Sequence, residues 1–139
     1  MRNSTIESSS VEQNEQENTS ILQENIILWN DIFYMNDKDD YRSVLIRTGE
    51  SGTFLIRPQS KRTSSNDHDY TLCLYHKTLG IRCFGIFESQ TRGIEYSLVK
   101  KGRETFGDMI QLCQYYIKNP LPMTTQNIFL TKPYKTILN

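Results

Sequence analysis

The stretch GTFLIRPQS, residues 52–60, determines how the rest of the chain is interpreted. Residues 53–56 are apolar or β-branched and predict a buried strand, which ends at Pro58 because proline lacks the backbone N–H that strand pairing uses. Arg57 directly follows this run, and on a strand its side chain shares a face with Leu55. A permanent positive charge is therefore predicted at the end of a central strand, where it is costly to desolvate unless it is paired.

Two explanations of Arg57 are equally consistent with these residues. In the first, the guanidinium pairs with a distant carboxylate such as Asp69 or Glu88, or extends to solvent at the sheet edge. In the second, its counter-ion is a bound anion. Residues 1–25 carry one arginine and five glutamates, a net charge of −4, so residues 26–139 carry +4. This mild positive charge suits an anionic ligand, but it is too weak for a nucleic-acid partner.

The cysteines and histidines predict neither a disulfide framework nor a metal site. Cys73, Cys83 and Cys113 have no C-x-x-C spacing, so we expect reduced thiols, no metal and no cofactor. None of the three is followed by an arginine six residues later, as in a phosphate-cradling phosphatase loop. His68 and His76 lack nucleophile or metal-ligand spacing, so we expect no enzyme.

The N-terminus lacks the apolar segment of a signal peptide, and no stretch approaches the roughly 20 apolar residues of a membrane span. We therefore expect a cytoplasmic protein that does not contact a membrane.

The pattern along the chain predicts one α+β domain over residues 26–134, after a disordered polar and acidic tail over 1–25 and before a short tail over 135–139. The order of elements predicts a central antiparallel sheet flanked by two helices, one on each face. The expected elements are a helix between a cap at Asp37 and Gly49, strands over 53–57, 70–76, 81–87 and 94–99, and a helix that starts at a Thr105–Asp108 capping box and stops before Pro120.

Several of these features, in this order, resemble an SH2 domain, the phosphotyrosine-binding module. Trp29 stands at the start, GTFLIR (52–57) matches G-[ST]-F-L-[VI]-R, and a strand YTLCL (70–74) follows. FGDMIQLCQYY (106–116) has the spacing of the family's second helix, F-x-[DS]-L-x-x-L-x-x-Y-Y. The resemblance extends from Trp29 to Pro133, about three quarters of the chain.

The resemblance implies that Arg57 pairs bidentately with the phosphate of phosphotyrosine, which carries nearly two negative charges. An arginine at the floor of a slot is reached by a tyrosyl side chain but not by phosphoserine. Lys38 is implied over the phosphotyrosine ring, although it could equally be a solvated surface lysine. The loop after Arg57 is implied to supply phosphate donors, or else to be idle. Its candidate donors are Gln59, Ser60, Lys61, Arg62, Thr63, Ser64 and Ser65.

The chain also departs from the family pattern. Cys83 stands where a histidine is common, Gly85 where a lysine is common, and Gln59 where a serine is usual. We expect the long loop over 60–69 to wrap the phosphate and compensate. Phe84 and Gly85 are the candidate peptide surface, although Phe84 could be a core residue. We expect no deep second pocket and low selectivity for the sequence around phosphotyrosine.

The implied partners are tyrosine-phosphorylated proteins or peptides, bound by a monomer. The absence of alanine and the polar tail resemble the single-domain SH2 proteins that intracellular bacteria such as Legionella secrete into the host-cell cytoplasm. The alternatives are a degenerate SH2 scaffold without strong phosphotyrosine binding, and a fragment of a eukaryotic adaptor. The initiating methionine and the brief C-terminal tail favour a stand-alone domain over a fragment.

Overall fold

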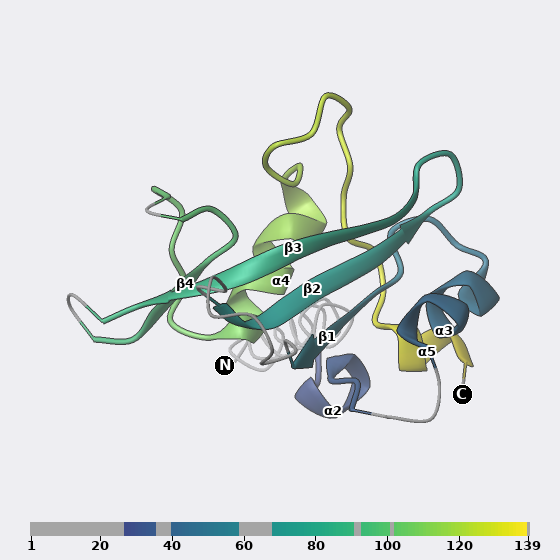
Figure 1. The fold of residues 1–139 in the computed structure, drawn as a ribbon, viewed down its shortest axis with the longest axis horizontal. Coiled ribbons are helices and arrows are strands. Elements are labelled where there is room, and N and C mark those ends of the chain that lie inside the picture. The colour runs from purple at the N-terminus through teal and green to yellow at the C-terminus, as the bar shows by residue number, and fades with distance from the viewer. Residues whose placement is uncertain (1–26, 36–39, 59–67, 91–92, 101, 139) are drawn as a thin grey trace, which may run out of the picture.

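The computed structural model describes residues 27–35, 40–58, 68–90, 93–100 and 102–138. Four strands form one antiparallel sheet in the order β1-β2-β3-β4, and the helices pack around it, which confirms the predicted α+β class (Figure 1). The elements are α2 (Trp29–Ile32), α3 (Tyr41–Thr48), β1 (Phe54–Pro58), β2 (His68–His76), β3 (Gly80–Ser89), β4 (Glu95–Ser97), α4 (Met109–Lys118) and α5 (Tyr134–Leu138).

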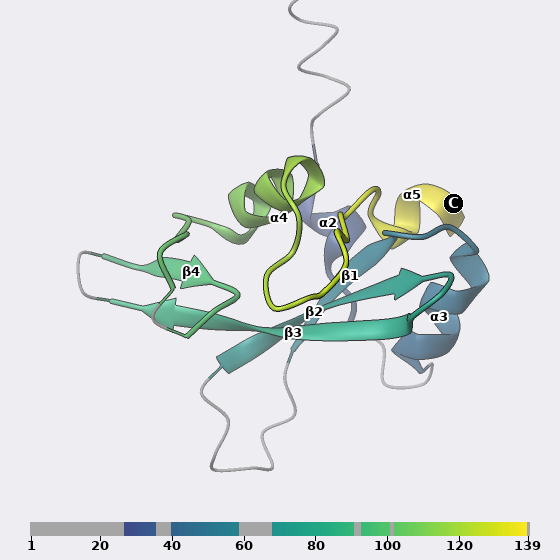
Figure 2. The ribbon, with the colours of Figure 1, turned by 90° about the horizontal axis from the view of Figure 1, so that it is seen from above.

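The two faces of the sheet enter two separate cores. Phe54 and Ile56 of β1 belong to the larger core, together with residues of α2 and α4, whereas Leu55 belongs to the smaller core under α3 and α5. Figure 2 shows α4 alongside the strands and α3 near the end of the sheet. Because successive residues of a strand point to opposite faces, Arg57 is placed on the α3 face with Leu55. The sequence predicted this face correctly, but the expectation of a central strand is wrong: β1 stands first in the order of the described strands, and it meets Phe33 and Pro133 only through isolated bridges.

The N-cap of the first long helix lies three residues after its predicted position. The N-cap of α3 is Asp40, whose carboxylate accepts a hydrogen bond from the backbone N–H of Arg42 at 3.1 Å, so the prediction of Asp37 is wrong. Its C-terminus was predicted correctly, since Gly49 adopts a left-handed conformation with φ 69°. Aspartates occur at 37, 39 and 40, and all are plausible caps by residue type.

The second long helix also differs at its start. Asp108 is itself the N-cap of α4, accepting from the backbone N–H of Gln111 at 2.8 Å, so the predicted capping box from Thr105 is wrong. Phe106 lies outside the helix and bridges to Tyr96 through two backbone hydrogen bonds of 2.8 and 2.9 Å. This pairing with Tyr96 of β4 holds Phe106 outside the helix. The helix ends at Lys118, as predicted.

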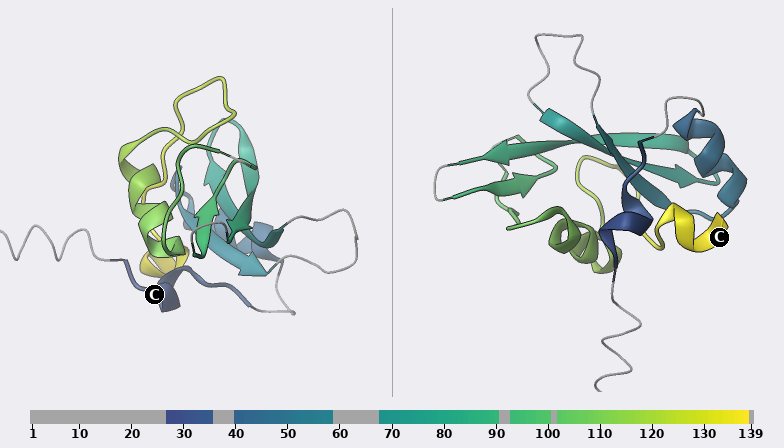
Figure 3. Two further views of the ribbon diagram at one scale, coloured as in Figure 1. Left: turned by 90° about the vertical axis from the view of Figure 1, so that its left-hand side faces the viewer. Right: turned by 90° about the horizontal axis from the view of Figure 1, so that it is seen from below.

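The C-terminal segment returns to the start of the sheet and ends in α5, beside α2 and α3 (Figure 3). The Tyr134 hydroxyl donates a hydrogen bond to the backbone carbonyl of Phe33 at 3.1 Å. The backbone N–H of Phe54 donates to the backbone carbonyl of Lys132, also at 3.1 Å. The region predicted as a short tail, 135–139, is therefore helical as far as Leu138. The predicted tail over 1–25 lies outside the described residues. Of the described helices, none has the length and apolar character needed to cross a membrane.

Candidate functional site

Arg57 lies near the end of β1, on the face that α3 covers, and its side chain is half-buried. Its Nε atom is fully buried and has no hydrogen-bond partner among the described residues. One terminal nitrogen is 3.5 Å from the carbonyl oxygen of Pro58, which is at the outer limit of a hydrogen bond. Within the described part of the chain, the Nε donor is thus unpaired, and the guanidinium also interacts with Cys73 and Tyr41.

Neither of the carboxylates considered from the sequence neutralises this charge. In the described residues, Asp69 and Glu88 form no ion pair with Arg57, and Glu88 instead accepts from the side chain of Gln90 at 3.0 Å. Burial by itself would lower the pKa of Arg57. Its interactions with Cys73 and Tyr41 outweigh this effect and raise the pKa above its ordinary value, so the guanidinium stays charged. The structure therefore gives no support to an internal salt bridge among the residues it describes.

The ring of Tyr41, at the start of α3, supports the guanidinium. The Cζ atom of Arg57 lies 4.2 Å from the ring centroid, a cation–π distance. The Tyr41 hydroxyl lies 3.6 Å from Sγ of Cys83. Burial raises the pKa of Tyr41, so the phenol is neutral at physiological pH. The sequence pattern did not predict this role of Tyr41 at Arg57.

Two cysteines complete the floor beside Arg57. Cys73 of β2 and Cys83 of β3 are register partners, and their sulfur atoms are 3.0 Å apart. Cys73 is fully buried, whereas Cys83 is exposed. We call the group of Arg57, Tyr41, Cys73 and Cys83 the Arg57 site. Gly85 lies on the same face as Arg57. Thr71 of β2 is the register partner of both residues, and directly paired residues of neighbouring strands share a face of the sheet.

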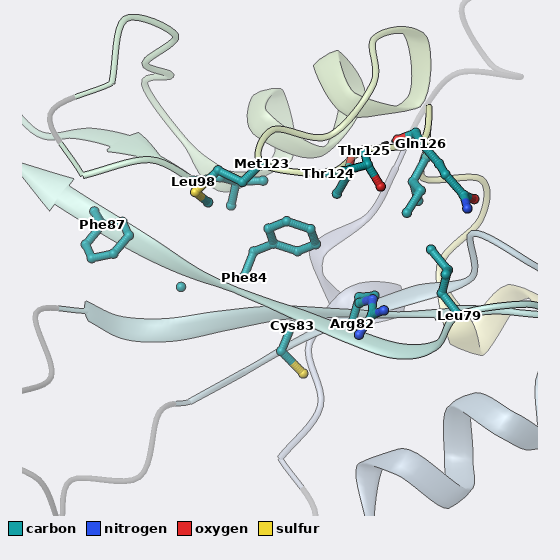
Figure 4. A pocket seen from close by; sticks show the side chains of 12 residues that line it. Leu79, Arg82, Cys83, Phe84, Phe87, Leu98, Met123, Thr124, Thr125 and Gln126 are labelled. Carbon is teal, nitrogen blue, oxygen red and sulfur yellow. Dashed lines mark hydrogen bonds between the residues drawn. The ribbon is translucent and has the colours of Figure 1, made fainter.

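The opposite face of β3 borders a cavity of about 520 Å³, which we call the Phe84 cavity. Figure 4 shows the Phe84 ring pointing toward the segment that follows α4, whereas the Cys83 sulfur points to the other side of the strand. The cavity's lining is apolar at Leu79, Phe84, Phe87, Leu98, Met123 and Ile128, and polar or charged at Arg82, Thr124, Thr125 and Gln126. Residues 123–126 and Ile128 line this cavity from above β3. The absence of a deep second pocket stays a prediction.

The family model for the SH2 domain matches residues 32–116, more than half of the chain. The chain belongs to the SH2 domain family. A comparison with curated proteins found none that matches it. SH2 domains bind phosphotyrosine-containing peptides and proteins and are generally non-catalytic, so this SH2 domain is a phosphotyrosine-type binding module in fold and class.

The structure brings together only part of the predicted site of this SH2 domain. Arg57, Cys83 and Gly85 share one face of the sheet, and Phe84 is a buried core residue that also lines the cavity on the other face. In the described residues, no group of three or more His, Cys, Asp or Glu side chains could hold a metal ion. The remaining predicted phosphate-site residues lie outside the described residues: Lys38, Gln59, Ser60, Lys61, Arg62, Thr63, Ser64 and Ser65.

Proposed function

We propose that this SH2 domain binds tyrosine-phosphorylated peptides by pairing Arg57 bidentately with the phosphate. The observation that carries the proposal is the half-buried guanidinium, which rests on the Tyr41 ring and has no carboxylate partner among the described residues. A half-buried positive charge is unfavourable unless an anion pairs with it, and we propose that the ligand supplies this anion.

The chemistry of the ligand follows from this geometry. A guanidinium presents parallel N–H donors that fit two oxygens of a phosphate, and the charge-assisted bonds are about twice as strong as neutral ones. The guanidinium lies over the Tyr41 ring, and its buried Nε donor has no partner among the described residues. Since Arg57 is recessed beneath α3, a long phosphotyrosyl side chain reaches it and a phosphoserine side chain does not.

The proposal is tested by titration with one peptide in three forms, carrying phosphotyrosine, tyrosine or phosphoserine at the same position. Binding of only the phosphotyrosine form, weakened by added salt, supports it, because attraction between partly exposed charges is screened. Equal binding of the tyrosine form contradicts it. Assaying free phosphate in the same samples tests the further proposal that the domain does not hydrolyse its ligand.

We also propose that the Phe84 cavity receives an aliphatic side chain of the bound peptide. Its apolar lining and its volume of about 520 Å³ support this, and they count against the low selectivity expected from the sequence. Met123→Glu, which puts a charge at the cavity rim, is expected to abolish preferences in a degenerate phosphotyrosine library. Met35→Glu is the matched control, because Met35 is similarly exposed but does not line the cavity. Unchanged preferences in Met123→Glu refute this assignment.

For the biological setting, we propose a monomeric bacterial effector that acts on tyrosine-phosphorylated proteins in the host cytoplasm. The alanine-free composition and the acidic N-terminal stretch support this setting. Expression of the full chain in cultured animal cells, followed by affinity recovery, tests it. Enrichment of phosphotyrosine proteins that depends on Arg57 is the expected result, and its absence contradicts the proposal.

A further inference from the structure

The Arg57 site contains a pair of thiols that phosphate binding does not require. Cys73 and Cys83 face each other across β2 and β3, with their sulfur atoms 3.0 Å apart. The Cys83 thiol donates a hydrogen bond to the Cys73 sulfur. Directly opposed residues of antiparallel strands have Cα atoms about 4.5–5.5 Å apart, which lies within the roughly 4.4–6.8 Å range of disulfides. A bond of about 2.05 Å therefore needs the sulfur atoms to approach by only about 1 Å.

The two thiols differ in access to solvent. Cys83 is exposed, so a small soluble oxidant can reach its sulfur, whereas Cys73 is fully buried beneath it. This is the arrangement of an attacking thiol and a resolving thiol. Cys113 provides a contrast in the same chain, because it lies on α4 and is buried in the core, where burial raises its pKa.

The surroundings of Cys83 also favour its reactive form. The hydrogen bond between the two sulfur atoms lowers the pKa of Cys83 to about 6, against the opposing effect of burial. The Tyr41 hydroxyl and the positive charges of Arg57 and Arg42 lower the pKa of Cys83 further. The thiolate is the nucleophile in thiol oxidation, so Cys83 is the sulfur that reacts first.

We propose that Cys73 and Cys83 form a modification site that hydroperoxides oxidise to a disulfide. The Cys83 thiolate attacks one oxygen of hydrogen peroxide, the O–O bond breaks, and Cys83 sulfenic acid and hydroxide form. The Cys73 sulfur then attacks the Cys83 sulfur, and the sulfenic oxygen leaves as water with the thiol proton. In total, two thiols and one peroxide give one disulfide and two waters. The site lies on β2 and β3 and does not depend on whether the domain binds phosphotyrosine.

The test uses the reduced full chain and hydrogen peroxide, without any phosphopeptide. After oxidation, remaining thiols are blocked with N-ethylmaleimide and the protein is digested with trypsin without reduction. The three cysteines fall in separate tryptic peptides, residues 63–77, 83–92 and 104–118. The expected product is the 63–77 peptide linked to the 83–92 peptide, with the 104–118 peptide carrying no disulfide and no sulfenic acid.

Two single variants separate the steps. Cys73→Ser is expected to stop at the sulfenic acid of Cys83, which dimedone traps, whereas Cys83→Ser is expected to leave Cys73 at least tenfold slower to oxidise. Cys113→Ala is the matched control and is expected to form the linked peptide at the wild-type rate. Recovery of the 63–77 and 83–92 peptides as separate maleimide adducts, at peroxide levels that oxidise free glutathione, overturns the proposal. So does preferential oxidation of Cys113.

Discussion

Replacing Arg57 with leucine should separate ligand binding from folding. The variant keeps an apolar stem of similar length on the α3 face of β1 and removes the guanidinium. Two charge-assisted hydrogen bonds to phosphate are lost, each contributing about 1.5–3 kcal/mol. A total of about 3–6 kcal/mol corresponds to an affinity on the order of 100- to 10,000-fold lower, since each 1.4 kcal/mol is a factor of about ten.

The free energy of unfolding should change little in the same variant. The buried Nε atom of Arg57 has no partner among the described residues, and leaving such an atom unsatisfied costs about 1–3 kcal/mol, which the leucine avoids. The lost stacking on Tyr41, at 4.2 Å, offsets this by about 0.5–2 kcal/mol. The two effects have opposite signs, so we expect a net change of no more than about 2 kcal/mol, from the same balance of costs.

Fluorescence anisotropy with a labelled phosphotyrosine peptide measures the first quantity, and urea unfolding monitored by Trp29, the single tryptophan, measures the second. Arg47→Leu is the control, because it removes the same charge from an exposed position in the last turn of α3. The control should bind within about twofold of wild type, as expected for an exposed charge. If Arg57→Leu retains affinity within threefold, or fails to fold, the reasoning about the unpartnered guanidinium is refuted.

Three further changes test the site and its support. Tyr41→Leu removes the ring beneath the guanidinium and should weaken phosphopeptide binding by about 1 kcal/mol, roughly fivefold, in the same anisotropy assay. Cys83→Ser should strengthen binding relative to wild type above pH 6 but not below it, because the pKa of Cys83 is about 6 and its thiolate competes with phosphate for positive charge. Gly52→Ala should lower the free energy of unfolding by about 2–4 kcal/mol in urea, because a Cβ there would lie 2.6 Å from the Thr131 side chain at φ +91°. Gly49→Ala should cost only about 1 kcal/mol, the price of its left-handed conformation, since its Cβ would meet nothing.

Each of these has an outcome that would contradict it. Full affinity in Tyr41→Leu would show that the cation–π contact does not position Arg57. A constant ratio of wild-type to Cys83→Ser affinity from pH 5 to 8 would show that the sulfur carries no charge near the phosphate. Equal stability losses in the two glycine variants would show that strain alone, and not crowding by the segment after α4, acts at Gly52.

The local sequence pattern was sufficient to predict most of the fold and the face of the sheet on which Arg57 lies. The alternation in β1 put Arg57 on the face of Leu55, and the glycine at 49 ended α3, because side-chain direction and left-handed backbone are properties of neighbouring residues. The caps were less well determined. Several aspartates near α3 offer the same local hydrogen bond. At α4, Asp108 and not Thr105 is the N-cap, and Phe106 between them pairs with Tyr96.

The sequence by itself therefore determined the SH2 class, the sheet and the side of it on which Arg57 lies. Only the tertiary structure decided what surrounds that arginine. The register set by the turn at 77–79 brings Cys73 to Cys83, and a slip by one residue would turn the sulfur atoms to opposite faces. Tyr41 under the guanidinium and residues 123–128 over Phe84 depend on helices and loops packing across the sheet. Such contacts join residues far apart in the chain, and no local periodicity specifies them.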